Sequence, residues 1–77
     1  MTEREYTILL DPDEEEGGYT VTVPALPGCV TQGETLDEAI AMARDAITGF
    51  IEALVKDGQP IPEEHVRPQL LTVRVAA

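Results

Sequence analysis

The sequence has little of what would staple a small protein together or perform chemistry. Among its 77 residues there is one cysteine, Cys29, so no disulfide can form within the chain. Cys29 and His65 are too few for a zinc site, which takes about four Cys or His ligands. His65 lies in a proline-bounded segment with no motif that would orient it as a base for a thiol. We therefore expect Cys29 to be a core residue, and we expect no catalytic residue, no cofactor and no metal.

Basic residues are also scarce, because five Lys and Arg stand against fifteen Asp and Glu, giving a formal net charge of −10. Nucleic-acid binding draws much of its affinity from clustered cations, and here they are scattered, so direct nucleic-acid binding is not expected. A basic protein partner fits the charge better, although acidity can also serve only to keep a small protein soluble. No apolar run approaches the roughly 20 residues that span a bilayer, so we expect no membrane association and a cytoplasmic location.

Length and apolar content predict one folded domain covering residues 1–77. Apolar residues make up 43% of the chain, which is ordinary for a folded protein. A chain this short buries only about 60% of its unfolded surface, so a single copy would be marginally stable. We expect a homo-oligomer, a dimer or a tetramer.

Alternating apolar and polar residues predict strands at 5–11, 19–23 and 70–75, and a shorter one at 29–32. Between the first two, the run 11–18 is rich in carboxylates and ends in two glycines, which is typical of a hairpin turn. Pro27 and Gly28 suit the two central positions of a type II turn before the short strand.

A long helix is predicted between Thr35 and about Asp57. Thr35 and Glu38 form a capping box, in which the hydroxyl accepts from the amide of Glu38 and the carboxylate accepts from the amide of Thr35. Gly58 is the expected C-terminal stop. The predicted fold class is α+β in the order β-β-β-α-β, with the helix packed on one face of an antiparallel sheet.

Two apolar stripes run along this helix, and together they are wider than one packing contact needs. We expect the first stripe to face the sheet: Leu36, Ile40, Ala43, Ile47, Ile51 and Leu54. The second contains the candidate oligomer interface: Met42, Ala46, Gly49, Phe50 and Ala53, beside Ala39. The alternative is that these small residues only let the helix lie close to its own sheet.

The residues from Gly18 to Ala39 closely resemble the HicB family of type II antitoxins, including its short, stand-alone members. The matching positions are Gly18, Tyr19, Pro24, Leu26, Pro27, Gly28, Cys29, Gly33, Thr35, Glu38 and Ala39. Pro27, Gly28, Gly33 and Thr35 are explained by turn and cap geometry, so the motif is mainly structural.

The resemblance implies a partly reduced ribonuclease-H-like fold without nuclease activity, and a partner. That partner is a HicA-like toxin, a small basic ribonuclease that cuts mRNA and is neutralised by direct masking of its RNA-binding face. The acids expected to face the toxin are Asp11, Asp13, Glu14, Glu15 and Glu16.

Other functions stay open at this point. Longer members of the family carry a C-terminal DNA-binding module, whereas this sequence resembles the short form, so we do not expect it to bind operator DNA. One alternative is an orphan homo-oligomeric binding module without a toxin partner. Another is a residual metal-dependent nuclease that uses Asp11.

Overall fold

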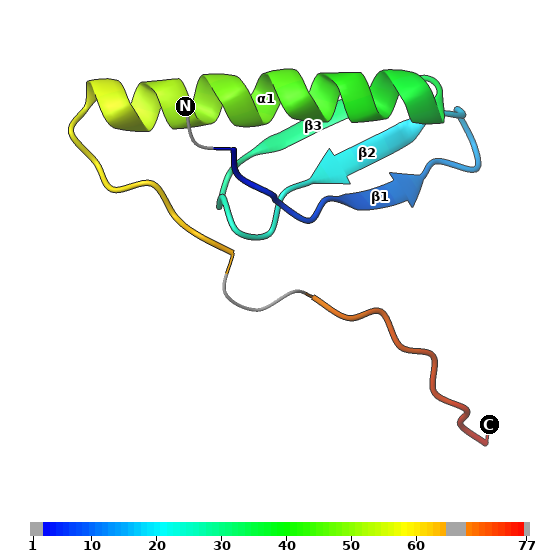
Figure 1. Ribbon diagram of the computed structural model, residues 1–77. Helices are drawn as coiled ribbons and strands as arrows, with labels where there is room; N and C mark the ends of the chain where they lie inside the picture. The colour runs from blue at the N-terminus through cyan, green and yellow to red at the C-terminus, as the bar shows by residue number, and fades with distance from the viewer. Residues whose placement is uncertain (1–2, 65–67, 77) are drawn as a thin grey trace.

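The computed structural model describes residues 3–64 and 68–76. A three-stranded antiparallel sheet in the order β1-β2-β3 is covered on one face by a single long helix (Figure 1). The strands are β1 (Leu9–Pro12), β2 (Tyr19–Thr22) and β3 (Val30–Gly33), and the helix is α1 (Leu36–Lys56). The predicted α+β class and the order β-β-β-α are confirmed.

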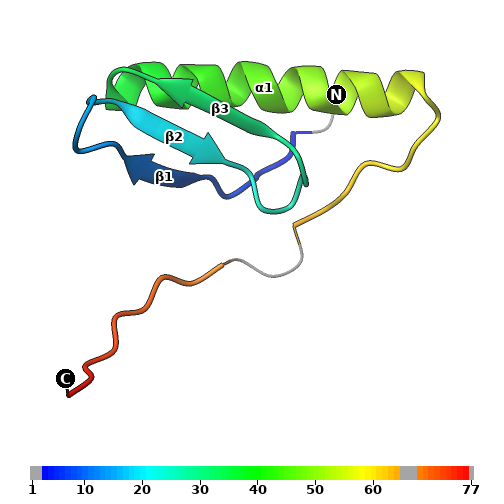
Figure 2. The same cartoon turned by 180° about the vertical axis from the view of Figure 1, so that it is seen from behind.

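The sheet is built from two consecutive antiparallel pairings, so chain order equals strand order (Figure 2). In β1 and β2, Leu10 lies opposite Val21 and Pro12 opposite Tyr19. In β2 and β3, Val21 lies opposite Thr31. All three strands have four residues, so the first is shorter than predicted: it begins at Leu9 and not near residue 5.

The helix ends are set by local sequence. At the start, the Thr35 hydroxyl accepts from the amide of Glu38 at 3.1 Å, as predicted. The returning bond is displaced by one residue, because the Glu38 carboxylate accepts from the amide of Glu34 at 3.2 Å and not from that of Thr35. At the other end, Gly58 adopts φ +70° while its amide donates to Val55 and the amide of Gln59 donates to Leu54. This pair of bonds is a Schellman stop.

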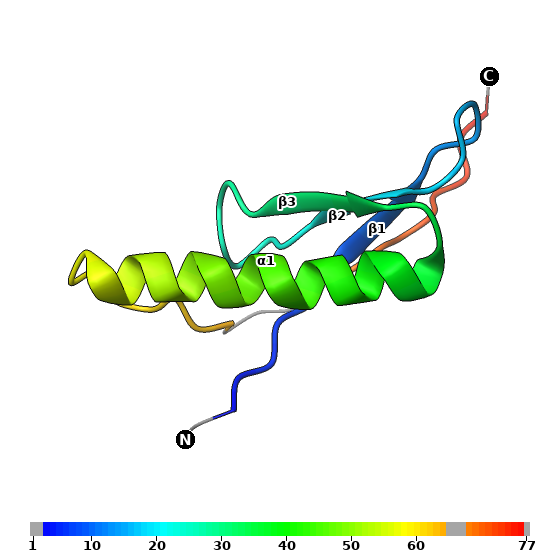
Figure 3. The same cartoon turned by 90° about the horizontal axis from the view of Figure 1, so that it is seen from above.

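The core lies between the helix and the sheet in two adjoining clusters. One contains Val21, Ala39 and Ala43. The other contains Val23, Leu26 and Cys29, with the half-buried Ala46, Ile47 and Phe50 packed against it. The loop between β2 and β3 packs on the helix at the end of the sheet, and the C-terminal turns of the helix project beyond this loop (Figure 3).

This packing corrects the predicted division of the helix into two stripes. Ala39, Ala46 and Phe50, which were assigned to the second stripe, face the sheet and its loop. Leu36, which was assigned to the sheet-facing stripe, is 47% exposed. The apolar arc is real, but its buried part also takes in Ala39, Ala46 and Phe50, so the side of the helix that faces the core is shifted toward the second stripe.

The predicted last strand is not formed. Residues 68–76 are extended, carry no strand, and run away from the sheet beyond β1 (Figures 1 and 2). The alternation of apolar and polar residues indicates only that this segment is able to form a strand. A strand also needs the edge of another strand to pair with, and the sequence pattern does not specify that edge.

Candidate partner-binding surface

The acidic turn between β1 and β2 is a defined structure and not a loose loop. The Asp13 carboxylate accepts from the amides of Glu15 and Glu16 at 3.0 and 3.1 Å. The Asp13 amide donates to the Gly18 carbonyl at 2.9 Å, and the Gly17 amide donates to the Asp13 carbonyl at 2.9 Å. Gly17 and Gly18 adopt φ values of +80° and +82°, a conformation that favours glycine. The turn therefore holds its acids at fixed backbone positions.

The carboxylates on this turn point into solvent. Residues 11–17 are all exposed. Asp13 uses its carboxylate to hold the turn, whereas those of Glu14, Glu15 and Glu16 accept no hydrogen bond from any described residue. Three adjacent carboxylates are thus left available for an external cation. Asp11, in β1, is also exposed, so this region presents five exposed acids.

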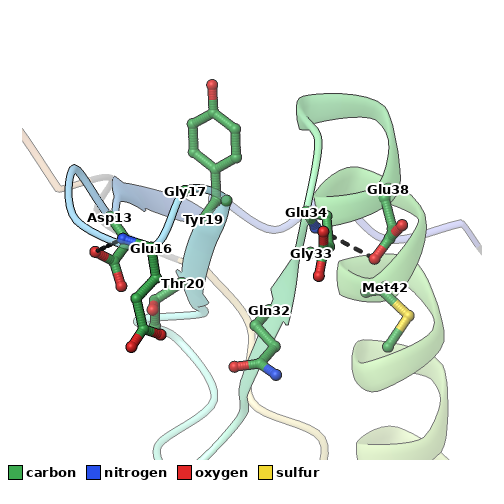
Figure 4. A pocket seen from close by; sticks show the side chains of 11 residues that line it. Asp13, Glu16, Gly17, Tyr19, Thr20, Gln32, Gly33, Glu34, Glu38 and Met42 are labelled. Atoms are coloured by element: carbon green, nitrogen blue, oxygen red, sulfur yellow. Dashed lines mark hydrogen bonds between the residues drawn. The ribbon is translucent and has the colours of Figure 1, made fainter.

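A cavity of about 330 Å³ lies between this turn and the start of the helix. Figure 4 shows Asp13 and Glu16 on one side, Glu38 and Met42 from the helix on the other, and Gln32 from β3 between them. Glu34 also contributes to its wall, so four acidic residues and no basic residue line it. Its chemistry suits a Lys or Arg side chain from a partner, since carboxylates and these cations form charge-assisted hydrogen bonds.

Sequence reasoning placed the acids of the turn but missed this cavity. Glu38 was interpreted as a capping-box residue and a motif position, and neither Glu34 nor Glu38 was connected with the acidic turn. The register of β2 and β3 brings them near the turn, because Tyr19 pairs with Gly33. A signal for this approach was present in the two glycines, Gly18 and Gly33, which permit the close contact.

The family-motif residues have structural positions, as expected for most of them. Leu26, Cys29 and Ala39 are buried, and Tyr19 packs beside Val21. The Cys29 amide donates to the Leu26 carbonyl at 2.9 Å with Gly28 at φ +89°, which confirms the predicted type II turn. Pro24 follows β2, while Pro27 is exposed at the tip of that turn.

Gly33 has a different role from the one predicted. Its φ is not in the left-handed region. A Cβ added there would lie 2.6 Å from Ala39 Cα and 2.9 Å from the Glu38 carbonyl carbon. Gly33 is therefore explained by the close contact between β3 and the first turn of the helix.

The candidate oligomer interface on the helix is divided by the fold. Ala46 and Phe50 pack against the chain's own loop cluster. Met42 is 40% exposed, and Gly49 and Ala53 are also exposed. Only these last three residues are available to a partner, and they form one flank of the helix.

The described residues include one thiol, that of Cys29. Cys29 is buried, and desolvation raises the pKa of its thiol, which disfavours the nucleophilic thiolate. His65 lies outside the described residues. In the ranges 3–64 and 68–76, no group of three or more His, Cys, Asp and Glu could hold a metal ion. No helix in this part of the chain is long and apolar enough to cross a membrane.

Comparison with known proteins identifies similar sequences over most of the chain. A family model described as the HicB-like antitoxin of a bacterial toxin-antitoxin system matches residues 6–72. A UPF0150 protein of Thermoplasma acidophilum is 47% identical over 60 residues, which are 78% of this chain and 86% of that protein. A UPF0150 protein of Synechocystis is 41% identical over 70 residues, or 91% of this chain and 87% of the relative.

Longer relatives carry the name antitoxin. Antitoxin HicB of Escherichia coli K12 is 39% identical over 57 residues, which are 74% of this chain but 41% of that protein. The chain thus spans less than half the length of this named antitoxin, and nearly all of the UPF0150 relatives.

Proposed function

Because the chain belongs to the HicB-like antitoxin family of bacterial toxin-antitoxin systems, we propose that it binds and neutralises a small basic toxin that cleaves mRNA. It acts by covering the toxin's RNA-binding face, and not by catalysis. The observation that carries the proposal is the rigid acidic turn beside an acid-lined cavity.

Charge gives this surface its specificity. An RNA-cleaving protein presents cations that bind phosphates, and carboxylates placed at similar spacing compete for the same groups. Glu14, Glu15 and Glu16 are free to do so because, among the carboxylates of residues 13–16, only that of Asp13 takes part in holding the turn. The cavity adds a recess for one cationic side chain, with Glu34 and Glu38 opposite Glu16.

The experiment is co-expression of the chain with the short basic protein encoded beside its gene. We expect relief of growth arrest and co-purification of the two proteins. The informative variant is Glu14→Gln, Glu15→Gln, Glu16→Gln, which removes three charges and leaves Asp13 in place. A control with the same change in net charge is Asp45→Asn, Glu52→Gln, Glu63→Gln, at exposed positions away from the turn.

Comparing the binding affinities of the two variants distinguishes recognition by this turn from a general effect of negative charge. Loss of at least about 1 kcal/mol of binding free energy in the first variant, and little change in the control, is expected for partly desolvated charge pairs. Equal loss in both would mean that only overall charge matters. Absence of any complex with the wild-type chain would overturn the proposal and favour an orphan binding module.

A further inference from the structure

Among the described residues, the large apolar side chains with the highest exposed fractions lie in one segment, the C-terminal arm, residues 68–76. Leu70 is 91% exposed, and Leu71, Val73 and Val75 are 77–80% exposed. The arm alternates as a strand does, with Leu71, Val73 and Val75 on one face and Leu70, Thr72 and Arg74 on the other. Exposed apolar side chains grouped in this way mark an interaction site, and an unpaired strand-like backbone is a template for pairing with another strand.

A free sheet edge is present on the same molecule. Strand β1 is an edge strand, and within the described residues it pairs with β2 alone. The helix packs over β3 and β2, and the helix axis does not lie over β1. The outer hydrogen-bonding groups of β1 are therefore open to a fourth strand (Figure 2).

The helix also leaves apolar surface uncovered on the β1 side. Met42 of the helix and Gln32 of β3 both line the cavity. The flank of the helix that carries Met42 therefore lies at the β3 edge of the sheet. At about 100° per residue, Ile40 and Ile51 lie roughly 160–180° from Met42 around the helix, on the flank toward β1. Both are only half-buried. A strand added to β1 would cover them with its apolar face.

The segment that precedes the arm is anchored to the N-terminal part of the chain, and the arm itself points away from the sheet. The Tyr6 hydroxyl donates to the Pro62 carbonyl at 2.6 Å. The Glu64 carboxylate accepts from the amide and the hydroxyl of Thr7, each at 2.6 Å. From this anchor near the start of β1, residues 68–76 extend outward, well separated from β1 (Figures 1 and 2).

We propose that the arm of one copy adds as a strand to the β1 edge of a second copy, and that the exchange is reciprocal. A projecting arm and a free edge on each protomer are complementary, and a two-fold axis pairs both at once. Charge favours the same partner, because the arm carries Arg74 and no acidic residue while the chain as a whole carries −10. The proposal is independent of the antitoxin function.

The first test is the mass of the purified chain by light scattering, together with isotope-filtered NMR on a mixture of labelled and unlabelled protein. We expect at least two copies per particle, and nuclear Overhauser contacts between Val73 methyls of one copy and Leu10 of another. A monomer would overturn the proposal. So would contacts found only within one chain, which would mean that the arm folds back on its own edge.

A matched pair of variants tests the face of the arm. Val73→Asp places a carboxylate on the face assigned to the helix flank, and we expect the dimer dissociation constant to rise at least about 100-fold. Thr72→Asp adds the same charge on the opposite face and should change it much less. Equal effects, or a dimer that survives Val73→Asp, would contradict the assignment. The labelled-mixture experiment uses the wild-type chain and does not depend on the folding of either variant.

Discussion

At the scale of single residues, two of the glycines belong to different physical classes. Gly17 adopts φ +80°, but a Cβ added there would meet nothing within 4 Å. Gly33 has an ordinary φ, but a Cβ there would collide with the backbone of Ala39 and Glu38. One is constrained by its own conformation, and the other by the distance between β3 and α1.

We predict that Gly33→Ala is the more damaging substitution. The clash involves helix backbone, which cannot move without separating the helix from the sheet, so we expect a loss of about 2–4 kcal/mol in the free energy of unfolding. Gly17→Ala should cost about 1 kcal/mol, the strain of a positive φ. Urea denaturation of both variants measures the difference. Equal losses would contradict the close contact between Gly33 and Ala39.

At the scale of elements, local sequence predicted those features that depend on a few neighbouring residues. The type II turn at Pro27–Gly28 and the two ends of the helix, set by Thr35 and Gly58, were predicted because proline, glycine and a capping threonine act within one turn of the chain. The arm was predicted wrongly as a strand of the same sheet. Its alternation is a property of the segment, whereas pairing depends on an edge elsewhere.

For the candidate site too, features set by neighbouring residues were predicted, and features set by contacts between distant segments were not. The acids of the turn were visible as a run in the sequence, so their exposure was predicted. The cavity was not, because it joins the turn at 13–18 to Glu34 and Glu38 through the register of β2 and β3. The sheet-facing centre of the helix was missed for a related reason: periodicity gives the width of an apolar arc, but the neighbouring loop determines which part of it is covered.

The helix flank that carries Met42, Gly49 and Ala53 is exposed, and it gives a prediction at the scale of elements. Gly49 is exposed in the middle of α1, and a Cβ added there meets nothing within 4 Å. Gly49→Ala should therefore stabilise the protein by about 0.5–1 kcal/mol, because alanine restricts the unfolded chain more and favours the helix. The measurement is the urea midpoint at two protein concentrations. A destabilising effect that grows with concentration would instead indicate that another copy packs closely on this flank.

At the scale of the whole molecule, the net charge of −10 is a source of self-repulsion as well as a means of recognition. The repulsion is greatest where adjacent carboxylates have no cation beside them, as at Glu14, Glu15 and Glu16. The same three groups are assigned above to the toxin. Stability of the free protein and affinity for a basic partner should therefore depend on them in opposite directions.

We predict that sodium chloride raises the melting temperature of the free protein. Going from about 20 mM to 500 mM salt shortens the Debye length from roughly 20 Å to about 4 Å, which screens repulsion between exposed acids. A gain of about 1 kcal/mol corresponds to roughly 4–8 °C for a domain of this size. The variant Glu14→Gln, Glu15→Gln, Glu16→Gln should melt higher than wild type at low salt and gain less from added salt. If salt instead lowered the melting temperature of the wild-type chain, attractive ion pairs would outweigh repulsion. If the variant bound the basic partner as well as wild type does, the three carboxylates would serve only solubility.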